Sequence, residues 1–257
     1  MMKPHFACER MSPRNVVVAL SAAVALLCGC QTPMKPTTRQ EAVTTTITVT
    51  QEYQYLRYLP PGYEEDREKR WPLVVFLHGA GERGNDIELI KKHGLPKLIQ
   101  AGKDFPFVMI APQCPAGEWW NIVALEGLIE QATSELRIDR DRIYLTGLSM
   151  GGFGTWGLAV WHPERYAAIL PICGGGERQL ARVLRDVPVW AFHGDADPVV
   201  PVERTLEMID AIQKAGGSPR LTVYPGVQHD SWTATYENPE IYEWLLAQRL
   251  SERAQAK

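Results

Sequence analysis

The chain has 257 residues, of which 45% are hydrophobic and 22% are charged, and its formal net charge is −3. A chain of this length can bury roughly 70% of its unfolded surface, which suffices for one self-supporting domain. The weak negative charge gives no sign of a nucleic-acid partner or of electrostatic binding to an anionic membrane. The cysteines have no spacing typical of a zinc or redox motif.

Residues 1–29 are predicted to be a secretory signal peptide that lies outside the fold. Lys3, Arg10 and Arg14 form a basic start, and residues 16–27 form an apolar run. A basic segment followed by a short apolar one is typical of export signals, and this run is too short for a stable membrane span. The mature protein is therefore expected outside the cytoplasm.

The end of this segment, Leu27 to Cys30, resembles the processing box of bacterial lipoproteins, with Cys30 as the lipid acceptor. Cys28 departs from the pattern, because a small residue such as alanine is usual there. Lipidation would give a durable membrane anchor, since several acyl chains on one cysteine bind far more strongly than one. Residues 30–43 are rich in threonine and proline and are interpreted as a tether. The alternative is ordinary secretory cleavage without a lipid.

The remaining residues, 44–257, are predicted to form a single catalytic domain. Residues 44–49 and 53–58 alternate β-branched and aromatic side chains, which indicates a pair of edge strands. Residues 71–77 are almost continuously apolar, as in parallel strands that are buried on both faces. Further elements are expected to alternate along the chain: strands 107–110, 142–146, 167–172, 187–192 and 220–224, and helices 121–136, 152–161, 202–215 and 239–250.

Strands that alternate with helices after antiparallel edge strands predict an α/β fold, a three-layer α/β/α sandwich around a mostly parallel mixed sheet. Only fourteen residues separate the predicted strands that end at Ile172 and begin at Val187. No other connection is long enough for a lid domain, so we expect an open site.

A glycine-flanked serine marks the junction between strand 142–146 and helix 152–161. Residues 147–152 read Gly-Leu-Ser-Met-Gly-Gly, with Ser149 in the middle of a G-x-S-x-G motif. In a nucleophile elbow this serine has a strained backbone, and the glycines avoid collisions at the sharp turn. The motif alone is weak evidence, because chance produces it in roughly one chain in ten of this length. A flexible glycine-rich turn is the alternative.

Polar residues also follow three other predicted strands, where ligands bind in open α/β sheets. These segments are residues 78–84, 193–201 and 228–232. Together with the serine motif they place Ser149, Asp197 and His229 in the order Ser, Asp, His, which is the order of α/β-hydrolases. We predict that Ser149 is the nucleophile, His229 its base, and Asp197 the acid that orients the histidine. Asp195 is a rival for the acid.

These segments resemble the α/β-hydrolase superfamily over about residues 45–250. Leu77–Gly84 (LHGAGERG) and Gly147–Gly154 (GLSMGGFG) resemble the branch of carboxylesterases, feruloyl esterases and polyhydroxybutyrate depolymerases. Related bacterial sequences are often labelled phospholipase/carboxylesterase or predicted peptidase. The resembling motif His-Gly-x-x-Asp-x-x-Val-Pro selects Asp197 over Asp195.

The oxyanion hole is expected to use the backbone N–H of Met150, which follows the nucleophile, and by resemblance that of Ala80. The resemblance also implies the α/β-hydrolase fold. His78 is interpreted as a residue that shapes the loop. No cofactor is expected, and no histidine or cysteine spacing suggests a metal. Cys114 and Cys173 are expected to be free, mostly buried thiols.

Five tryptophans were considered as pocket or core residues. Trp119 and Trp120 follow a strand end, and Trp232 lies three residues after the predicted base, so each could wall a substrate pocket. Burial under a loop is equally consistent with their positions. Trp156 and Trp161 are expected in the core, behind the nucleophile.

The sequence therefore predicts an exported, lipid-anchored serine hydrolase that cleaves small or polymer-borne carboxylic esters through an acyl-enzyme intermediate. The alternatives are a serine peptidase related to prolyl oligopeptidases and an inactive, anchored binding protein. The expected partners are the ester substrate and the membrane that holds the lipid on Cys30, in the periplasm or at the cell surface.

Overall fold

The computed structural model describes residues 7–8, 42–46 and 50–255. The elements discussed below belong to one compact unit, Met1–Glu9 with Tyr53–Lys257, and residues 10–52 form a second unit. The predicted lipid acceptor Cys30 and nearly all of the predicted signal peptide and tether lie outside the described residues. Within the described ranges, no helix combines the length and the apolar character needed to cross a membrane.

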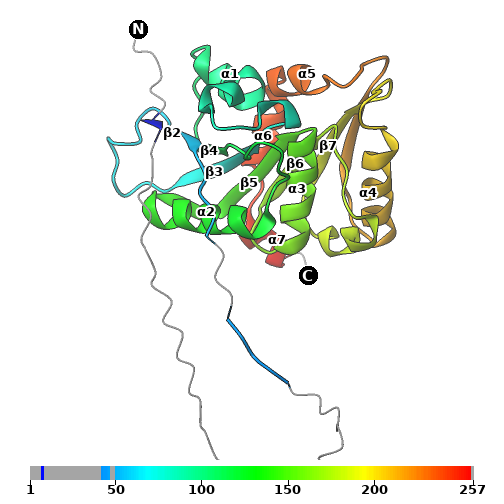
Figure 1. Cartoon of the computed structure of the whole chain (residues 1–257), viewed down its shortest axis with the longest axis horizontal. Helices are drawn as coiled ribbons and strands as arrows, with labels where there is room; N and C mark the ends of the chain where they lie inside the picture. Colours follow the sequence, from blue (N-terminus) through cyan, green and yellow to red (C-terminus); the bar gives the residue numbers. More distant parts are fainter. Residues whose placement is uncertain (1–6, 9–41, 47–49, 256–257) are drawn as a thin grey trace, which may run out of the picture. The chain divides into compact units, whose positions relative to one another are not determined.

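The strands form one mixed sheet in the order β1-β2-β4-β3-β5-β6-β7-β8 (Figure 1). Their bounds are β1 Ala7–Cys8, β2 Tyr55–Tyr58, β3 Trp71–Leu77, β4 Val108–Pro112, β5 Ile138–Leu148, β6 Ala168–Ile172, β7 Trp190–Gly194 and β8 Arg220–Tyr224. The pairs β1–β2 and β2–β4 are antiparallel, and all other pairs are parallel. The expected mostly parallel mixed sheet is thus confirmed.

One edge of the sheet differs from the prediction. Residues 44–46 form no strand, and residues 47–49 lie outside the described part of the chain. The second predicted edge strand forms as β2, which is buried at three of its four residues. Its outer edge pairs with Ala7–Cys8, which differs from the expectation that residues 1–29 lie wholly outside the fold.

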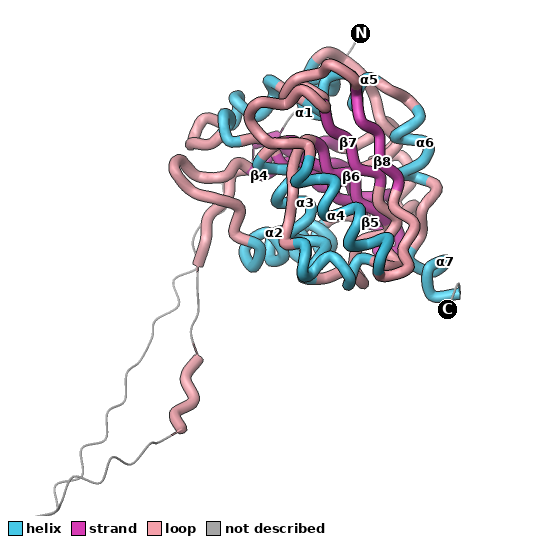
Figure 2. Tube along the Cα trace, turned by 90° about the vertical axis from the view of Figure 1, so that its right-hand side faces the viewer, coloured by secondary structure: helices cyan, strands magenta, loops and turns pink. Residues whose placement is uncertain are grey.

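The helices cover both faces of the sheet (Figures 1 and 2). Their bounds are α1 Gly94–Gln100, α2 Ile122–Glu135, α3 Met150–Trp161, α4 Glu203–Lys214, α5 Trp232–Glu237, α6 Glu240–Leu246 and α7 Leu250–Gln255, with 3-10 turns η1 Ala80–Glu82, η2 Ile87–Lys92 and η3 Arg178–Leu184. Helices α2, α3 and α4 share a core with Leu73, Val75 and Leu77, whereas α1, α5 and α6 pack with Val74 and Phe76. Alternate residues of β3 therefore enter opposite cores, which is why this strand is apolar throughout.

The predicted closing helix 239–250 is interrupted and forms α6 and α7. The hydroxyl of Tyr144, from β5, donates to the carbonyl of Gln248 at 2.9 Å. That carbonyl is therefore engaged by the sheet at the interruption. Helices α1 and α5 were not predicted, because six or seven residues are too few to display a helical period.

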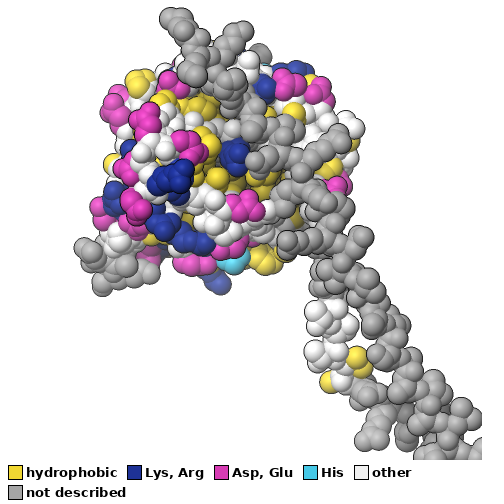
Figure 3. Space-filling model, turned by 90° about the vertical axis from the view of Figure 1, so that its left-hand side faces the viewer, with side chains coloured by type: hydrophobic (Ala, Val, Ile, Leu, Met, Phe, Trp, Pro, Cys, Tyr) yellow, Lys and Arg dark blue, Asp and Glu magenta, His cyan; other side chains and the backbone are white. Residues whose placement is uncertain are grey.

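The connections agree with an open fold. The predicted short connection between β6 and β7 holds only the turn η3, and no separate lid domain is inserted between residues 53 and 255. On the face drawn in Figure 3, basic side chains lie among acidic ones, so neither charge forms a continuous area there. The loops that follow β3, β5, β7 and β8 all leave the carboxyl edge of the parallel strands, where the candidate site lies.

Candidate active site

Ser149 has the strained backbone that an elbow requires. It stands between β5 and α3 with φ 54° and ψ −119°, a region that non-glycine residues rarely adopt. The turn is held on both sides, because Ser149 N–H donates to the carbonyl of Ile172 at 3.0 Å and the Ser149 carbonyl accepts from Phe153 N–H at 3.0 Å. These contacts fix the serine above the ends of β5 and β6.

The glycines of the motif are required by close backbone approaches. A Cβ on Gly151 would lie 1.9 Å from the carbonyl oxygen of Leu77, and one on Gly147 would lie 2.4 Å from that of Gly151. Backbone atoms cannot retreat as a flexible side chain can, so neither position accepts a larger residue without distortion. The elbow is thus packed directly against the end of β3.

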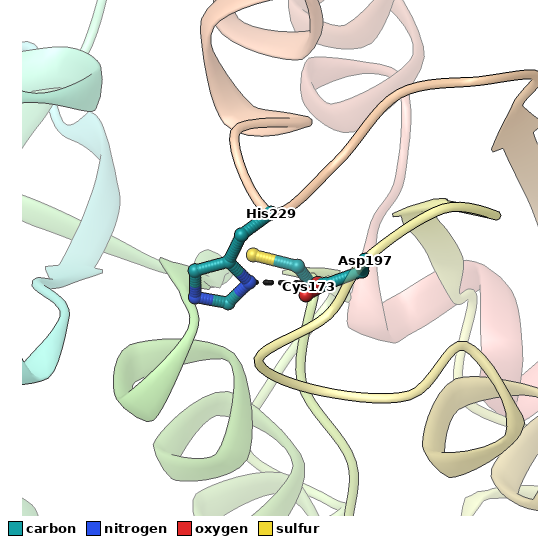
Figure 4. A group of neighbouring side chains, drawn as sticks. All are labelled: Cys173, Asp197 and His229. Atoms are coloured by element: carbon teal, nitrogen blue, oxygen red, sulfur yellow. Dashed lines mark hydrogen bonds and ion pairs between the residues drawn. The ribbon is translucent and has the colours of Figure 1, made fainter.

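Ser149, His229 and Asp197 form one hydrogen-bonded chain. His229 Nε2 lies 3.0 Å from Ser149 Oγ, and His229 Nδ1 lies 2.7 Å from Asp197 Oδ2. Figure 4 shows the second of these contacts, with His229 and Asp197 reaching toward each other from different loops. Because the carboxylate can only accept, Nδ1 carries the proton and Nε2 can accept the serine hydroxyl. The histidine side chain is 19% exposed and the Asp197 side chain is fully buried.

The surroundings keep Asp197 ionised. Its Oδ1 accepts the backbone N–H groups of Val199 at 2.8 Å and Val200 at 3.0 Å. Burial raises the pKa of Asp197, but the hydrogen bonds from His229 and from these two backbone groups outweigh burial and lower the pKa below its usual value. The rival carboxylates are engaged elsewhere: Asp195 accepts from Gly226 N–H, and Asp230 accepts from the N–H and hydroxyl of Thr233.

The loop after β3 lies beside the elbow. A Cβ placed on Gly79 would lie 3.6 Å from the Cβ of Ser149. His78 Nε2 accepts from Cys114 N–H at 2.9 Å, so its Nδ1–H donates to the carbonyl of Gly79 at 2.6 Å. Burial lowers the pKa of His78 to about 4, which keeps the ring neutral. In a trans peptide the N–H points opposite to the C=O, so Ala80 N–H points away from the His78 ring.

Cys173 is the third side chain of Figure 4. Its sulfur and ligand atoms of Asp197 and His229 all lie within 4.8 Å of one another, a group that could in principle hold a metal ion. Burial raises the pKa of the Cys173 thiol to about 12. A metal needs the thiolate and a free histidine nitrogen, whereas here the thiol is protonated and Nδ1 donates to Asp197. The arrangement suits proton transfer better than metal ligation. Cys173 and Cys114 are both free and buried, as expected.

The tryptophans proposed as pocket walls occupy three different environments. Trp119 is 56% exposed and meets Phe153, on the first turn of α3, edge to face at 5.9 Å. Trp120 is buried, with its ring 4.8 Å from that of His78. Trp232 lies perpendicular to the ring of His229 at 5.3 Å. Trp119 therefore lies against the first turn of α3 and Trp232 lies against the ring of His229, while the buried Trp120 contacts His78 of the loop of residues 78–84.

One core expectation was wrong. Trp156 is fully buried, but Trp161, at the end of α3, is 62% exposed. Five residues along a helix correspond to a rotation of about 140°, so the two side chains leave opposite sides of α3. Only Trp156 can therefore face the sheet.

Two residues near the triad were not singled out from the sequence. His193 is fully buried, and its Nε2 lies 3.2 Å from Asp197 Oδ2. Glu82 is 6% exposed, and its Oε1 lies 3.8 Å from His93 Nε2. Both residues lie in segments that follow predicted strands, residues 78–84 and 193–201. A polar residue after a buried strand is the sequence signal that could have indicated them. Their burial depends on the tertiary fold.

Comparisons with known proteins agree with this geometry. The phospholipase/carboxylesterase family model matches residues 119–240. A probable feruloyl esterase C of Aspergillus terreus is 25% identical over 207 residues, which cover 77% of this chain and 72% of that protein. A thermostable esterase of known crystal structure is 36% identical with a TM-score of 0.68, over 77% of this chain and 59% of its own.

A peptidase is also among the similar proteins. Dipeptidyl-peptidase 5 of Porphyromonas gingivalis is 22% identical over 237 residues, which cover 72% of this chain but only 33% of the peptidase. The likeness to the esterases extends over most of the chain and includes the shared α/β fold. The chain thus has the α/β-hydrolase fold and is similar to esterases of the phospholipase/carboxylesterase and feruloyl esterase families.

Proposed function

We propose that the protein is a serine esterase that cleaves carboxylic esters through an acyl-enzyme on Ser149. The observation that carries the proposal is the unbroken hydrogen-bonded chain from Ser149 Oγ through His229 to Asp197 Oδ2. The strained backbone of Ser149 supports the proposal. Such a conformation costs roughly 1–3 kcal/mol of stability and typically persists where function requires it, here to expose the serine hydroxyl above the sheet.

The reaction follows from the direction of these hydrogen bonds. His229 Nε2 takes the hydroxyl proton as Ser149 Oγ attacks the ester carbonyl, and Asp197 stabilises the imidazolium that forms. The same proton then passes to the alkoxide leaving group as the C–O bond breaks. Water then attacks the acyl-enzyme while His229 takes its proton. His229 returns that proton to Ser149 Oγ, which releases the carboxylic acid and restores the serine.

The oxyanion of the tetrahedral intermediate is proposed to bind the backbone N–H groups of Met150 and Ala80. Met150 begins α3, where N–H groups lack partners within the helix and the helix dipole favours a negative charge. The hydrogen bond from His78 to the Gly79 carbonyl supports the second donor, since it turns Ala80 N–H away from the interior. Arg83 donates to the Ala80 carbonyl at 2.9 Å and so holds the next peptide of the same turn.

Esters with an aromatic group are the proposed substrate class. Trp119 and Phe153 present an exposed aromatic surface four residues from the nucleophile along α3, and Trp232 lies beside the base. Aromatic side chains at an exposed site bind flat, apolar groups well. The relative from Aspergillus terreus is named a feruloyl esterase, which agrees with such a substrate. An open fold without a lid suits soluble or polymer-borne esters.

The test is turnover by the full chain of matched esters and amides. We expect feruloyl and other aryl esters to have higher kcat/KM than alkyl esters of similar length, and aminoacyl amides to be poor substrates. A fluorophosphonate probe should label the enzyme in competition with the ester. Faster turnover of aminoacyl amides than of esters would replace the esterase by a serine peptidase, and a folded protein without labelling or turnover would indicate a binding protein.

We further propose export and anchoring by a lipid on Cys30, on the basis of the basic and apolar pattern of residues 1–29. In bacterial cells, Cys30→Ala is expected to release the enzyme from the membrane fraction, whereas Cys28→Ala should leave it there. Metabolic labelling with a fatty acid provides the direct measurement. Membrane association that persists in Cys30→Ala would refute the anchor without affecting the esterase.

A further inference from the structure

A second histidine contacts the acid of the proposed triad. His193 lies in β7, and its side chain is fully buried. Its Nε2 is 3.2 Å from Asp197 Oδ2, the same oxygen that lies 2.7 Å from His229 Nδ1. One carboxylate oxygen thus stands between two imidazole rings.

The hydrogen bonds around His193 determine how many protons its ring carries. On one side, Nδ1 lies 2.8 Å from the hydroxyl oxygen of Thr205. That hydroxyl donates its single hydrogen to the carbonyl oxygen of Gly174, at 2.6 Å. It can therefore only accept from His193, so Nδ1 must carry a proton.

The other ring nitrogen also faces acceptors only. His193 Nε2 lies 2.9 Å from the carbonyl oxygen of Val200 and 3.2 Å from Asp197 Oδ2, and neither oxygen carries a hydrogen. A neutral ring would leave one nitrogen lone pair pointing at an acceptor in a fully buried site, which is costly. With the Thr205 hydroxyl donating to the Gly174 carbonyl, both ring nitrogens are satisfied only if both carry a proton.

We propose that His193 is held as an imidazolium and is a positioning residue that shares the carboxylate of Asp197 with His229. The two oxygens of Asp197 then accept four hydrogen bonds, from two backbone N–H groups and two imidazoles, which matches the capacity of a carboxylate. The carboxylate cannot rotate away from His229. This inference rests on the roles proposed above for Ser149, Asp197 and His229.

The charge has a consequence for the base. The imidazolium offsets the negative charge of Asp197, and a neutral side chain at position 193 would leave that charge uncompensated beside His229. Around the two rings, the thiol of Cys173, which follows β6, is uncharged, and Thr205 of α4 offers only a hydroxyl. The guanidinium of Arg204 lies 3.5 Å from Glu207. The carboxylate of Asp230, next to His229 in sequence, accepts from Thr233 and is the same in the wild type and in His193→Gln.

The first test reads the protonation state directly and does not depend on activity. In the full chain labelled with ¹⁵N-histidine, two ring nitrogens of the protonated type are expected for one residue throughout pH 6–9. The signals are assigned to His193 by their absence in His193→Gln, or by their contacts with Thr205 if that variant does not fold. A nitrogen of the unprotonated type on His193 in this range would overturn the proposal, even if Ser149 proves to be the nucleophile.

The second test is the pH profile of kcat/KM for an aryl ester. The two ring nitrogens lie 3.2 Å and 2.7 Å from the shared oxygen, so they are at most about 6 Å apart. Removing one unit charge at that distance, with an effective dielectric constant of about 20, changes the pH profile by roughly two pH units. His193→Gln is expected to move the acidic limb to higher pH by this amount. If kcat/KM of His193→Gln falls but its acidic limb stays at the wild-type pH, His193 has a merely structural role and the proposal is overturned.

Threonine variants give matched comparisons. Thr205→Val removes the acceptor of Nδ1–H and is expected to shift the limb in the same direction, whereas Thr205→Ser should restore the wild-type limb. Thr133→Val removes another buried threonine hydroxyl, which donates to the Glu130 carbonyl on α2, and should not move the limb. If the acidic limb of kcat/KM lies at the same pH in Thr205→Val and in the wild type, the assignment of a proton to Nδ1 of His193 is contradicted.

Discussion

Ser149→Ala is expected to lower kcat for ester hydrolysis by about 10⁴- to 10⁶-fold, because no other group can form the acyl-enzyme. The residual rate would come from substrate binding and oxyanion stabilisation alone. The fold should persist, since the Ser149 hydroxyl contacts His229 and alanine has the same backbone restrictions at φ 54°. Loss of one such hydrogen bond changes the free energy of unfolding by only about 1 kcal/mol.

The measurements are kcat at saturating aryl ester, labelling by a fluorophosphonate, and the thermal midpoint of unfolding. Ser134→Ala is the matched control, because Ser134 is an exposed serine on α2 whose hydroxyl binds the carbonyl of Gln131. The control should be labelled like the wild type. Undiminished labelling of Ser149→Ala would show that another residue is the nucleophile.

Asp197→Asn is expected to lower kcat by about 10⁴-fold, because it inverts the tautomer of the base. The Asn oxygen can replace Oδ1 and accept from Val199 and Val200, which places the amide N–H₂ where Oδ2 stood. His229 Nδ1 must then accept, its proton moves to Nε2, and the ring can no longer take the proton of Ser149. The amide also cannot accept from a protonated His193.

Asp195→Asn is the matched control for this variant. Asp195 accepts from Gly226 N–H and stabilises the loop, so its replacement should change kcat by less than about tenfold. A larger loss in Asp195→Asn than in Asp197→Asn would reverse the assignment of the acid. The pair therefore tests the choice between two carboxylates that are two residues apart.

The lowered pKa of Asp197 determines the sign of its pH effect. A carboxyl whose pKa is lower in the folded protein stabilises it fully above its unfolded pKa of about 3.9, and this contribution is lost as the pH falls through the folded value. Asp197 therefore remains ionised above its unfolded pKa of about 3.9.

Much of the framework could be predicted from local sequence. The apolar run of residues 71–77 and the β-branched segment of residues 220–224 form strands over the predicted ranges. Ser149 was recognised because the glycines beside it are needed for a backbone turn, which is a local requirement. By contrast, α1 and α5 are too short for a periodic signal, and the interruption after α6 coincides with a long-range hydrogen bond from the hydroxyl of Tyr144 in β5.

The sequence by itself determined the strand and helix alternation, the elbow, and the order of serine, acid and base, because these depend on side-chain period and on glycine at fixed positions. Only the tertiary structure decided that Trp119 meets Phe153, that Trp232 meets His229, and that His193 contacts Asp197, the carboxylate that the motif had indicated. Contacts among the loops of the site join residues up to 80 positions apart. They depend on how the loops converge at the carboxyl edge of the sheet, and no local pattern records that convergence.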